Sequence, residues 1–338
     1  MIESLSSFAP VVSIVIPTAG RPELLKRAIQ SCLTGKYASE TEVIVVPNGP
    51  DQSWTAVEEE LRQEPRVRFH YIQRGDQCLA RNAGLELATG ELVRFLDDDD
   101  YLFPEAASRQ YAFALNECLD LCSAGVTLED QESNHLGDLF QAATESVEEA
   151  VFGIARVQIP LAHVYRRTTL ASSRWRVGMR QSEDIVWLID YVAAAPRKWQ
   201  RFEESVGVWY QHDLQRQSLD RPSGRVHEAT AAALLEAKFQ LQRQGRWTNS
   251  LAAIFAAALW NLVHRAFPFR PVYWHKIAEL AQTIDLDARP IQPVYGYPLL
   301  KHLDPKLVMW ALLPKRWVGL TAGNIKSLLT GRDYRRRL

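Results

Sequence analysis

Residues 92–100 read LVRFLDDDD, a short apolar stretch that runs directly into four consecutive aspartates. The apolar part has the length and composition of a buried strand. Four adjacent carboxylates repel one another and are costly to desolvate, so beside a buried strand they favour a compensating cation. Oxygen-only ligands match a divalent metal such as Mn²⁺ or Mg²⁺. The alternative is a solvated acidic turn before a helix that begins near Pro104.

The segments before residue 92 alternate between strand and helix patterns. Strands are expected at residues 11–17, 42–46 and 67–72, and helices at residues 21–33, 54–63 and 78–88. Residues 11–17 (VVSIVIP) are β-branched and almost continuously apolar, which is typical of a strand buried on both faces of a parallel sheet. The alternation predicts an α/β fold with a mostly parallel sheet flanked by helices.

Polar and turn-forming residues follow each expected strand, at residues 18–21, 47–49, 74–76 and 97–100. In an open parallel sheet these segments meet at one rim, where ligands bind. On an extended backbone, side chains two positions apart face the same way, so Asp97 and Asp99 are expected to point into the crevice and Asp98 and Asp100 away from it. The sequence therefore predicts a single site beside the acidic run.

Composition places the chain among ordinary globular proteins. It has 338 residues, 47% hydrophobic and 23% charged, and a net charge of -1, which gives no sign of a nucleic-acid partner. Four cysteines without metal-finger spacing are typical of reduced thiols. Neither a signal-peptide pattern nor an apolar run long enough to cross a bilayer is found, so the expected location is cytoplasmic.

The second half of the chain has a mixed pattern. A strand is expected at residues 156–165, a helix at residues 184–194 and a strand at residues 204–210. The turn residues at 220–224 are the best linker candidate, because a long helical pattern begins at Val226. We therefore expect a catalytic α/β domain at residues 1–220 and a helical C-terminal region at residues 221–338.

Three segments in order carry a resemblance to a known family: VSIVIPTAGRPELLKRAIQSCL (12–33), EVIVVPNGPDQS (42–53) and CLARNAGLELATGELVRFLDDDDYLFP (78–104). Together they resemble the N-terminal half of family 2 glycosyltransferases with the GT-A fold, strongly over residues 11–105. The resemblance implies that Asp99 and His212 hold the metal ion. The nucleotide-sugar-binding residues that it implies are Pro17, Thr18, Asp97 and Arg81, with Asn82 beside Arg81. Arg21, Asn48 and Asp98 are expected to belong to the same binding site.

The sequence departs from the family pattern after the second strand. The family usually has a base-reading aspartate there, where this chain has Pro47 followed by Asn48. The Asn48 amide can donate and accept hydrogen bonds, so it either replaces the base contact or serves as a turn residue. A second departure is Gly20, where the family often has asparagine. A UDP-sugar is the expected donor, although the base-reading residue is changed.

Sugar transfer with inversion needs a carboxylate that takes the proton of the acceptor hydroxyl. Residues 182–184 (Ser-Glu-Asp) open a helical pattern, and related enzymes carry their catalytic base in an E-D pair here, so Asp184 is the first candidate and Glu183 the second. Without the resemblance, the pattern favours a plain helix start, with Ser182 as N-cap and the acids at the positive end of the helix dipole. His212 is either a metal-side ligand or a packing residue beside Tyr210.

The C-terminal region combines short apolar helices with basic segments. Residues 251–260 and 307–313 are apolar, and residues 301–338 contain nine Lys or Arg against two Asp, including Arg335, Arg336 and Arg337. Tryptophan and cations beside apolar helices fit an anionic membrane surface. A helical subdomain or a homo-oligomer contact explains the pattern equally well.

These observations predict a metal-dependent, inverting glycosyltransferase in polysaccharide or glycoconjugate synthesis. It would move a sugar from a nucleoside-diphosphate sugar to a hydroxyl of a glycan or lipid-linked acceptor. The alternative is a catalytically degenerate GT-A fold that binds a glycan or nucleotide without turnover, because the base-reading aspartate is missing.

Overall fold

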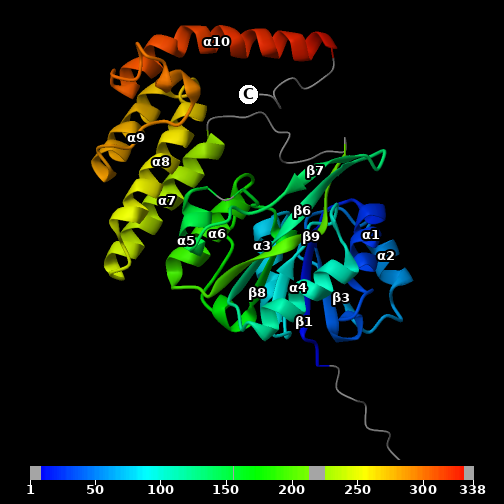
Figure 1. Cartoon of the computed structure of the whole chain (residues 1–338). Coiled ribbons are helices and arrows are strands. Elements are labelled where there is room, and N and C mark those ends of the chain that lie inside the picture. Colours follow the sequence, from blue (N-terminus) through cyan, green and yellow to red (C-terminus); the bar gives the residue numbers. More distant parts are fainter. Residues whose placement is uncertain (1–8, 155, 213–224, 331–338) are drawn as a thin grey trace, which may run out of the picture. The chain divides into compact units, whose positions relative to one another are not determined.

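The computed structural model describes residues 9–154, 156–212 and 225–330 of the chain (Figure 1). It has two compact units, Met1–Asp220 and Arg221–Leu338, which are treated separately below. The predicted linker at residues 220–224 and the basic residues 335–337 lie outside the described residues.

The first unit is built on one nine-stranded sheet, in the order β3-β2-β1-β4-β8-β6-β9-β5 with β7 paired to β6. The strands are β1 Val12–Thr18, β2 Thr41–Pro47, β3 Val67–Phe69, β4 Leu92–Phe95, β5 Tyr101–Leu102, β6 Leu121–Asp130, β7 His135–Leu139, β8 His163–Arg166 and β9 Trp199–Gln211. The first four pair in parallel, and β8 joins them antiparallel to β4. The predicted α/β fold class is confirmed: β1 to β4 form a parallel half, and β6 and β9 also pair in parallel in the other half of the sheet.

Helices on both sides bury the central strands. They are α1 Pro22–Cys32, α2 Thr55–Glu60, α3 Gln77–Leu87, α4 Pro104–Asn116, α5 Val147–Phe152 and α6 Glu183–Ala194. Every residue of β1 and β2 is buried, as their continuous apolar and β-branched composition predicts. Helix α3 packs on β1 so closely that a Cβ at Gly84 would lie 2.3 Å from Val15 Cγ1. The lack of a side chain at Gly84 therefore allows the short distance between α3 and β1, which in turn sets the position of Arg81 on α3.

The prediction of one strand over residues 156–165 is wrong in its first part. Residues 160–162 form a 3₁₀ turn that begins at Pro160, and the strand β8 starts only at His163. Proline has no N–H to donate to a strand ladder, so the pairing begins after the turn. The chain between α4 and α5 forms the β6–β7 hairpin, which the mixed pattern of residues 105–155 does not reveal.

The second unit is helical: α7 Arg225–Arg243, α8 Asn249–Ala266, α9 Pro271–Ile284 and α10 Pro305–Thr330 (Figure 1). Thr248 caps α8 by accepting a hydrogen bond from the backbone N–H of Leu251. Trp260 and Trp274 are fully buried between the helices. The apolar stretches at residues 251–260 and 307–313 are parts of α8 and α10. None of the described helices combines the length and apolar composition that a bilayer crossing requires.

Candidate active site

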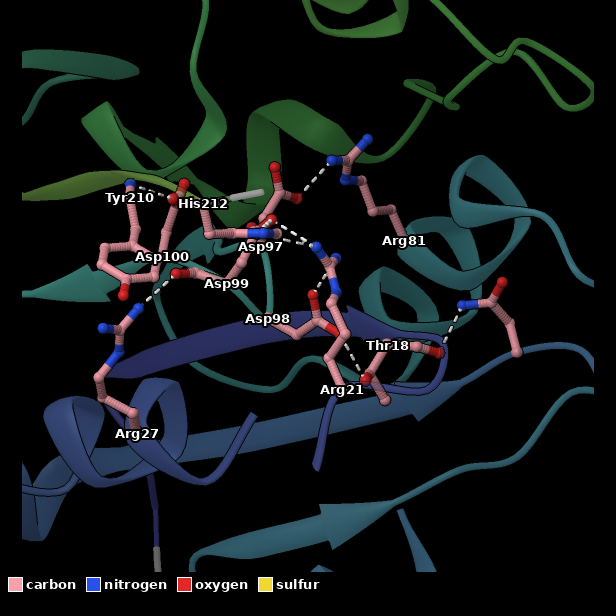
Figure 2. Close-up of polar contacts among 11 residues, drawn as sticks. Thr18, Arg21, Arg27, Arg81, Asp97, Asp98, Asp99, Asp100, Tyr210 and His212 are labelled. Atoms are coloured by element: carbon pink, nitrogen blue, oxygen red, sulfur yellow. Dashed lines mark hydrogen bonds and ion pairs between the residues drawn. The ribbon is translucent and has the colours of Figure 1, made fainter. Parts of the chain in front are cut away.

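The acidic run leaves the carboxyl end of β4 and folds into a turn (Figure 2). The backbone N–H of Asp100 donates to the carbonyl oxygen of Asp97 at 3.1 Å. Carboxylate oxygens of Asp97, Asp99 and Asp100 lie within 4.8 Å of one another. The expected placement of Asp100 is therefore wrong, because the turn replaces an extended backbone and brings Asp100 toward Asp97 and Asp99.

Asp98 points away from this cluster and is fully buried. Its Oδ2 accepts a hydrogen bond from Thr18 Oγ1 at 2.6 Å, and its Oδ1 forms an ion pair with Arg21. Burial raises the pKa of the Asp98 carboxyl to about 6, against the opposing effect of Arg21. Thr18 and Asp98 thus join the ends of the neighbouring strands β1 and β4.

Arg21 links the buried aspartate to the open cluster. Its Nη1 lies 2.5 Å from Asp99 Oδ2 and 3.5 Å from His212 Nε2 (Figure 2). His212, at the end of β9, has its Nε2 2.9 Å from Asp99 Oδ2, and only 3% of the residue is exposed. The His212 Nδ1 atom is buried and has no hydrogen-bond partner among the described residues. The structure thus brings the two predicted metal ligands together, with an arginine beside them.

Arg27 on α1 contacts the backbone of the turn at Asp99, and the sequence pattern does not single it out. Its guanidinium lies 4.4 Å from the ring centroid of Tyr101 and 4.0 Å from that of Tyr210, and its Nη2 donates to the Asp99 carbonyl at 2.7 Å. The backbone N–H of Tyr210 donates to Asp100 Oδ1 at 3.0 Å. A basic residue on an amphipathic helix carries no sequence signal for such a contact, because most face solvent.

Arg81 on α3 connects the acidic run with the start of α6. It is almost fully buried, its Nη2 donates to Asp97 Oδ1 at 2.6 Å, and its Nη1 lies 3.4 Å from Asp184 Oδ1. The guanidinium also lies 4.4 Å from the ring centroid of Trp175, which stacks on Trp187 at 4.5 Å. Two residues far apart in sequence, Asp97 and Asp184, therefore share one buried cation.

Asn82 holds the tryptophan in place. Its side-chain amide donates to the backbone oxygen of Trp175 at 2.9 Å and accepts from the Trp175 N–H at 2.8 Å. The neighbouring residues Arg81 and Asn82 of α3 therefore have different partners: Arg81 contacts carboxylates, and Asn82 bonds the backbone of Trp175. Trp175 lies in a segment without periodicity, so the sequence gives no reason to single it out.

Glu183 and Asp184 form the first turn of α6. Glu183 Oε1 accepts a hydrogen bond from Gln77 Nε2, and burial raises the pKa of its carboxyl. Burial and the Glu183 carboxylate raise the pKa of Asp184 well above its ordinary value, against the effect of Arg81. The preceding Ser182 has a left-handed backbone (φ 62°), and within the described residues its side chain makes no capping hydrogen bond to α6.

Pro17, Pro47 and Asn48 lie at the carboxyl ends of the neighbouring strands β1 and β2, and we call them the β1–β2 wall. Pro17 and Pro47 belong to the fully buried strands β1 and β2. The Asn48 amide donates to the Thr18 carbonyl at 2.9 Å and accepts from the Asp76 N–H at 3.0 Å. Both polar groups of Asn48 thus bind backbone, which ties together the loops after β1, β2 and β3.

Fold and site define an α/β domain of the GT-A type, with a carboxylate cluster at the carboxyl ends of its parallel strands. Residues 13–170 match the model of Glycosyl transferase family 2. Over that region the chain belongs to glycosyltransferase family 2.

One curated relative is a GalNAc(5)-diNAcBac-PP-undecaprenol beta-1,3-glucosyltransferase of Campylobacter jejuni, 24% identical over 188 residues, which are 53% of this chain and 59% of the relative. The matches cover 34% to 59% of the length of the first curated relatives.

Two solved structures share the fold. S. aureus TarS in complex with UDP-GlcNAc superposes with a TM-score of 0.58 at 15% identity, over 82% of this chain and 88% of that chain. The mannosyltransferase PcManGT of Pyrobaculum calidifontis, in complex with GDP-Man and Mn²⁺, superposes with a TM-score of 0.53 at 15% identity, over 94% and 88%. At this identity the likeness extends to the fold alone.

Proposed function

We propose that the first unit transfers a sugar from a nucleoside-diphosphate sugar to an acceptor hydroxyl, with a divalent metal ion and with inversion at the anomeric carbon. The observation that carries this proposal is the Arg81 guanidinium, which contacts both Asp97 at the acidic run and Asp184 at the start of α6. A carboxylate suited to proton transfer thereby lies next to the carboxylates suited to a metal-bound diphosphate. The family match supports the same reaction class.

The residues of the acidic run fit a divalent metal. Oxygen atoms of Asp97, Asp99 and Asp100 are close enough to act on one ion, and the buried His212 lies against Asp99. Asp99 and His212 would hold Mn²⁺ or Mg²⁺, with the neighbouring carboxylates supplying further oxygens. When bound, the ion supplies positive charge to the diphosphate leaving group. Arg21 would give up its contact with Asp99 and keep the one with Asp98.

Asp184 acts as the general base in this proposal. Its carboxylate takes the proton of the acceptor hydroxyl while the acceptor oxygen forms a bond to the anomeric carbon. The bond from that carbon to the diphosphate oxygen breaks, and the nucleoside diphosphate leaves with the electron pair. A raised pKa makes the Asp184 carboxylate a stronger base than an exposed aspartate. Glu183, hydrogen-bonded to Gln77, is the second candidate.

The nucleotide is proposed to lie between the acidic run and the β1–β2 wall, near Pro17, Thr18 and Arg21. A UDP-sugar is the first donor to test, since the TarS structure holds UDP-GlcNAc, whereas PcManGT holds GDP-Man. Both polar groups of the Asn48 side chain already form hydrogen bonds to backbone atoms. We therefore propose that backbone groups beside Asn48 form the hydrogen bonds to the nucleobase. The acceptor is proposed to be a glycan or a lipid-linked glycan, as in the name of the Campylobacter relative. The proposed location is cytoplasmic.

The second candidate is a degenerate GT-A fold that binds a nucleotide or glycan without turnover. Its motivation is the absence of the base-reading aspartate at Pro47 and Asn48. The intact acidic cluster and the Arg81 contacts favour turnover, because a binding protein has no need for a second carboxylate held by a buried arginine beside the donor.

Nucleotide binding with and without metal tests the donor site. Titration calorimetry with UDP and GDP should give binding that requires Mn²⁺ or Mg²⁺, and Asp99→Ala should abolish the metal requirement together with most of the affinity. Glu91→Ala, on the surface away from the run, is the matched control. Equal nucleotide binding by wild type and Asp99→Ala would refute the metal assignment.

A further inference from the structure

Large hydrophobic side chains are exposed mainly in one part of the second unit. Of the sixteen such residues that the described chain exposes, twelve fall between Phe269 and Val318, and only Tyr71, Leu136 and Val177 belong to the first unit. Isolated exposed apolar residues are ordinary, but a concentration of this kind marks an interaction surface. The proposed transfer reaction does not account for it.

Helix α10 orders part of this surface into a continuous stripe. Leu307, Ala311, Pro314 and Val318 are spaced three or four residues apart and are all exposed, so they follow one face of the helix. Leu307 and Val318 are 63% and 70% exposed. Val308, Met309 and Leu313, on the other side of the helix, are buried in the unit. We call the exposed set the outer stripe of α10.

Two tryptophans flank the outer stripe and are held in fixed positions. Trp310 Nε1 donates to His275 Nδ1 at 3.2 Å, and Trp317 Nε1 donates to the Pro268 carbonyl at 2.7 Å. Even so, 41% of Trp310 and 48% of Trp317 remain exposed. Indole rings ordered in advance lose little conformational freedom when they are covered. Tryptophan is also the side chain most suited to the boundary between lipid headgroups and acyl chains.

The segment that contains the stripe is mainly cationic, although Glu279 lies 3.7 Å from His275, the partner of Trp310. Residues 288–330 contain six Lys or Arg and a single acid, Asp304. Asp304 is engaged at the start of α10, where it accepts from the Lys306 N–H at 2.8 Å and pairs with Lys306 Nζ at 3.5 Å. Lys315 is exposed beside the stripe. The whole chain carries a net charge of only -1, so this excess of cations is local.

We propose that the outer stripe of α10, with Trp310, Trp317 and Lys315, is a docking surface for an anionic lipid bilayer. Apolar side chains would enter the headgroup boundary while the cations contact lipid phosphates. Charge decides between this partner and a second copy of the chain, because two such faces would bring cations of the same sign together. The inference is independent of the proposed transfer reaction, since vesicle binding needs no donor.

Co-sedimentation of the full chain with vesicles tests the surface. The protein should bind vesicles of phosphatidylcholine and phosphatidylglycerol in equal parts, and bind phosphatidylcholine alone much more weakly. Replacing two apolar residues by acids, in Leu307→Glu with Val318→Glu, should weaken binding by more than about tenfold, because both buried areas are lost. Leu136→Glu with Val177→Glu in the first unit is the matched control and should bind as wild type.

A second measurement covers the case in which the acidic variant fails to fold. Brominated lipid should quench part of the tryptophan fluorescence of wild type, and Trp310→Phe with Trp317→Phe should remove that quenching. Wild type that stays in the supernatant of anionic vesicles, or equal binding by the Leu307 and Val318 variant, would overturn the proposal. A wild-type dimer that this variant dissociates, without vesicle binding, would assign the stripe to a second copy instead.

Discussion

Arg21 Nη1 lies 2.5 Å from Asp99 Oδ2, so a protein cation already contacts the carboxylate that we propose as the metal ligand. The same guanidinium pairs with the buried Asp98. Two cations near one carboxylate repel each other, and the metal must therefore compete with Arg21. Arg21 therefore compensates part of the negative charge of the acidic run when no metal ion is bound, which stabilises the folded state.

Arg21→Met should accordingly strengthen Mn²⁺ binding in the absence of donor, by about tenfold, because one competing charge is removed. Calorimetry or the electron paramagnetic resonance signal of free Mn²⁺ would measure this affinity directly. Arg21→Lys keeps the charge and serves as the control. Unchanged or weaker Mn²⁺ binding by Arg21→Met would contradict the competition.

Arg81 lowers the pKa of Asp184, whereas burial and Glu183 raise it. A base must be deprotonated to act, so activity should fall as the pH drops through the raised pKa of Asp184. The acidic limb of kcat/KM should therefore lie at a higher pH than an ordinary aspartate would give. In Arg81→Met this limb should move to still higher pH, because the stabilising cation is gone.

Arg81→Lys should leave the limb close to that of wild type, since it retains the charge. Nucleotide binding measured over the same pH range separates the base from the metal ligands. A limb that moves to lower pH in Arg81→Met would argue against Asp184 as the base.

His163 makes the stability of the first unit depend on pH. It is buried, its Nδ1 lies 3.0 Å from Ser123 Oγ and its Nε2 3.2 Å from the Val157 carbonyl, and burial lowers its pKa to about 4. The unfolded chain, with an ordinary pKa near 6.5, binds the proton more readily. This contribution to stability is therefore complete above about pH 6.5 and is lost as the pH falls to about 4, a change of about 3 kcal/mol.

Urea unfolding of wild type and His163→Gln at several pH values would measure this slope. The variant should be less stable at neutral pH but should lose less stability between about pH 6.5 and 4. Parallel slopes for the two proteins would show that another group controls the acid sensitivity.

Gly84 tests the packing that positions Arg81. A methyl group there would lie 2.3 Å from Val15 Cγ1, so Gly84→Ala should cost about 1–3 kcal/mol through overpacking. Val15→Ala opens the space, and the double variant should recover part of that loss in a double-mutant cycle. Simple additivity of the two losses would mean that α3 and β1 do not meet as described.

The elements that follow from sequence are those with a strong local pattern. The β-branched run of β1, the turn after β2 and the periodic helix α3 all lie close to their expected residues, and the GT-A fold class and family resemblance are confirmed. The strand predicted at residues 156–165 is wrong in its first part because a turn begins at Pro160, and the apolar pattern gives no sign of this turn. Asp100 joins Asp97 and Asp99 because the chain turns where an extended backbone is expected.

The remaining site features depend on contacts between distant segments. Arg81 with Asp184, Arg27 with Tyr210, and Arg21 with His212 each join residues whose spacing says nothing about proximity. Trp175 belongs to an irregular segment and becomes visible only through its stacking on Trp187. The roles assigned to the individual site residues remain predictions.

The central claim is that this chain transfers sugar with Asp184 as base, and turnover by Asp184→Asn tests it most directly. Nucleoside diphosphate release and product configuration should be measured with UDP- and GDP-sugars, Mn²⁺ or Mg²⁺, and glycan acceptors. We predict inverted product from wild type and a loss of kcat of about 10²–10⁴-fold in Asp184→Asn with unchanged donor binding. Glu183→Gln should lose less. Wild-type turnover retained by Asp184→Asn, or donor binding without any turnover in wild type, would contradict the account.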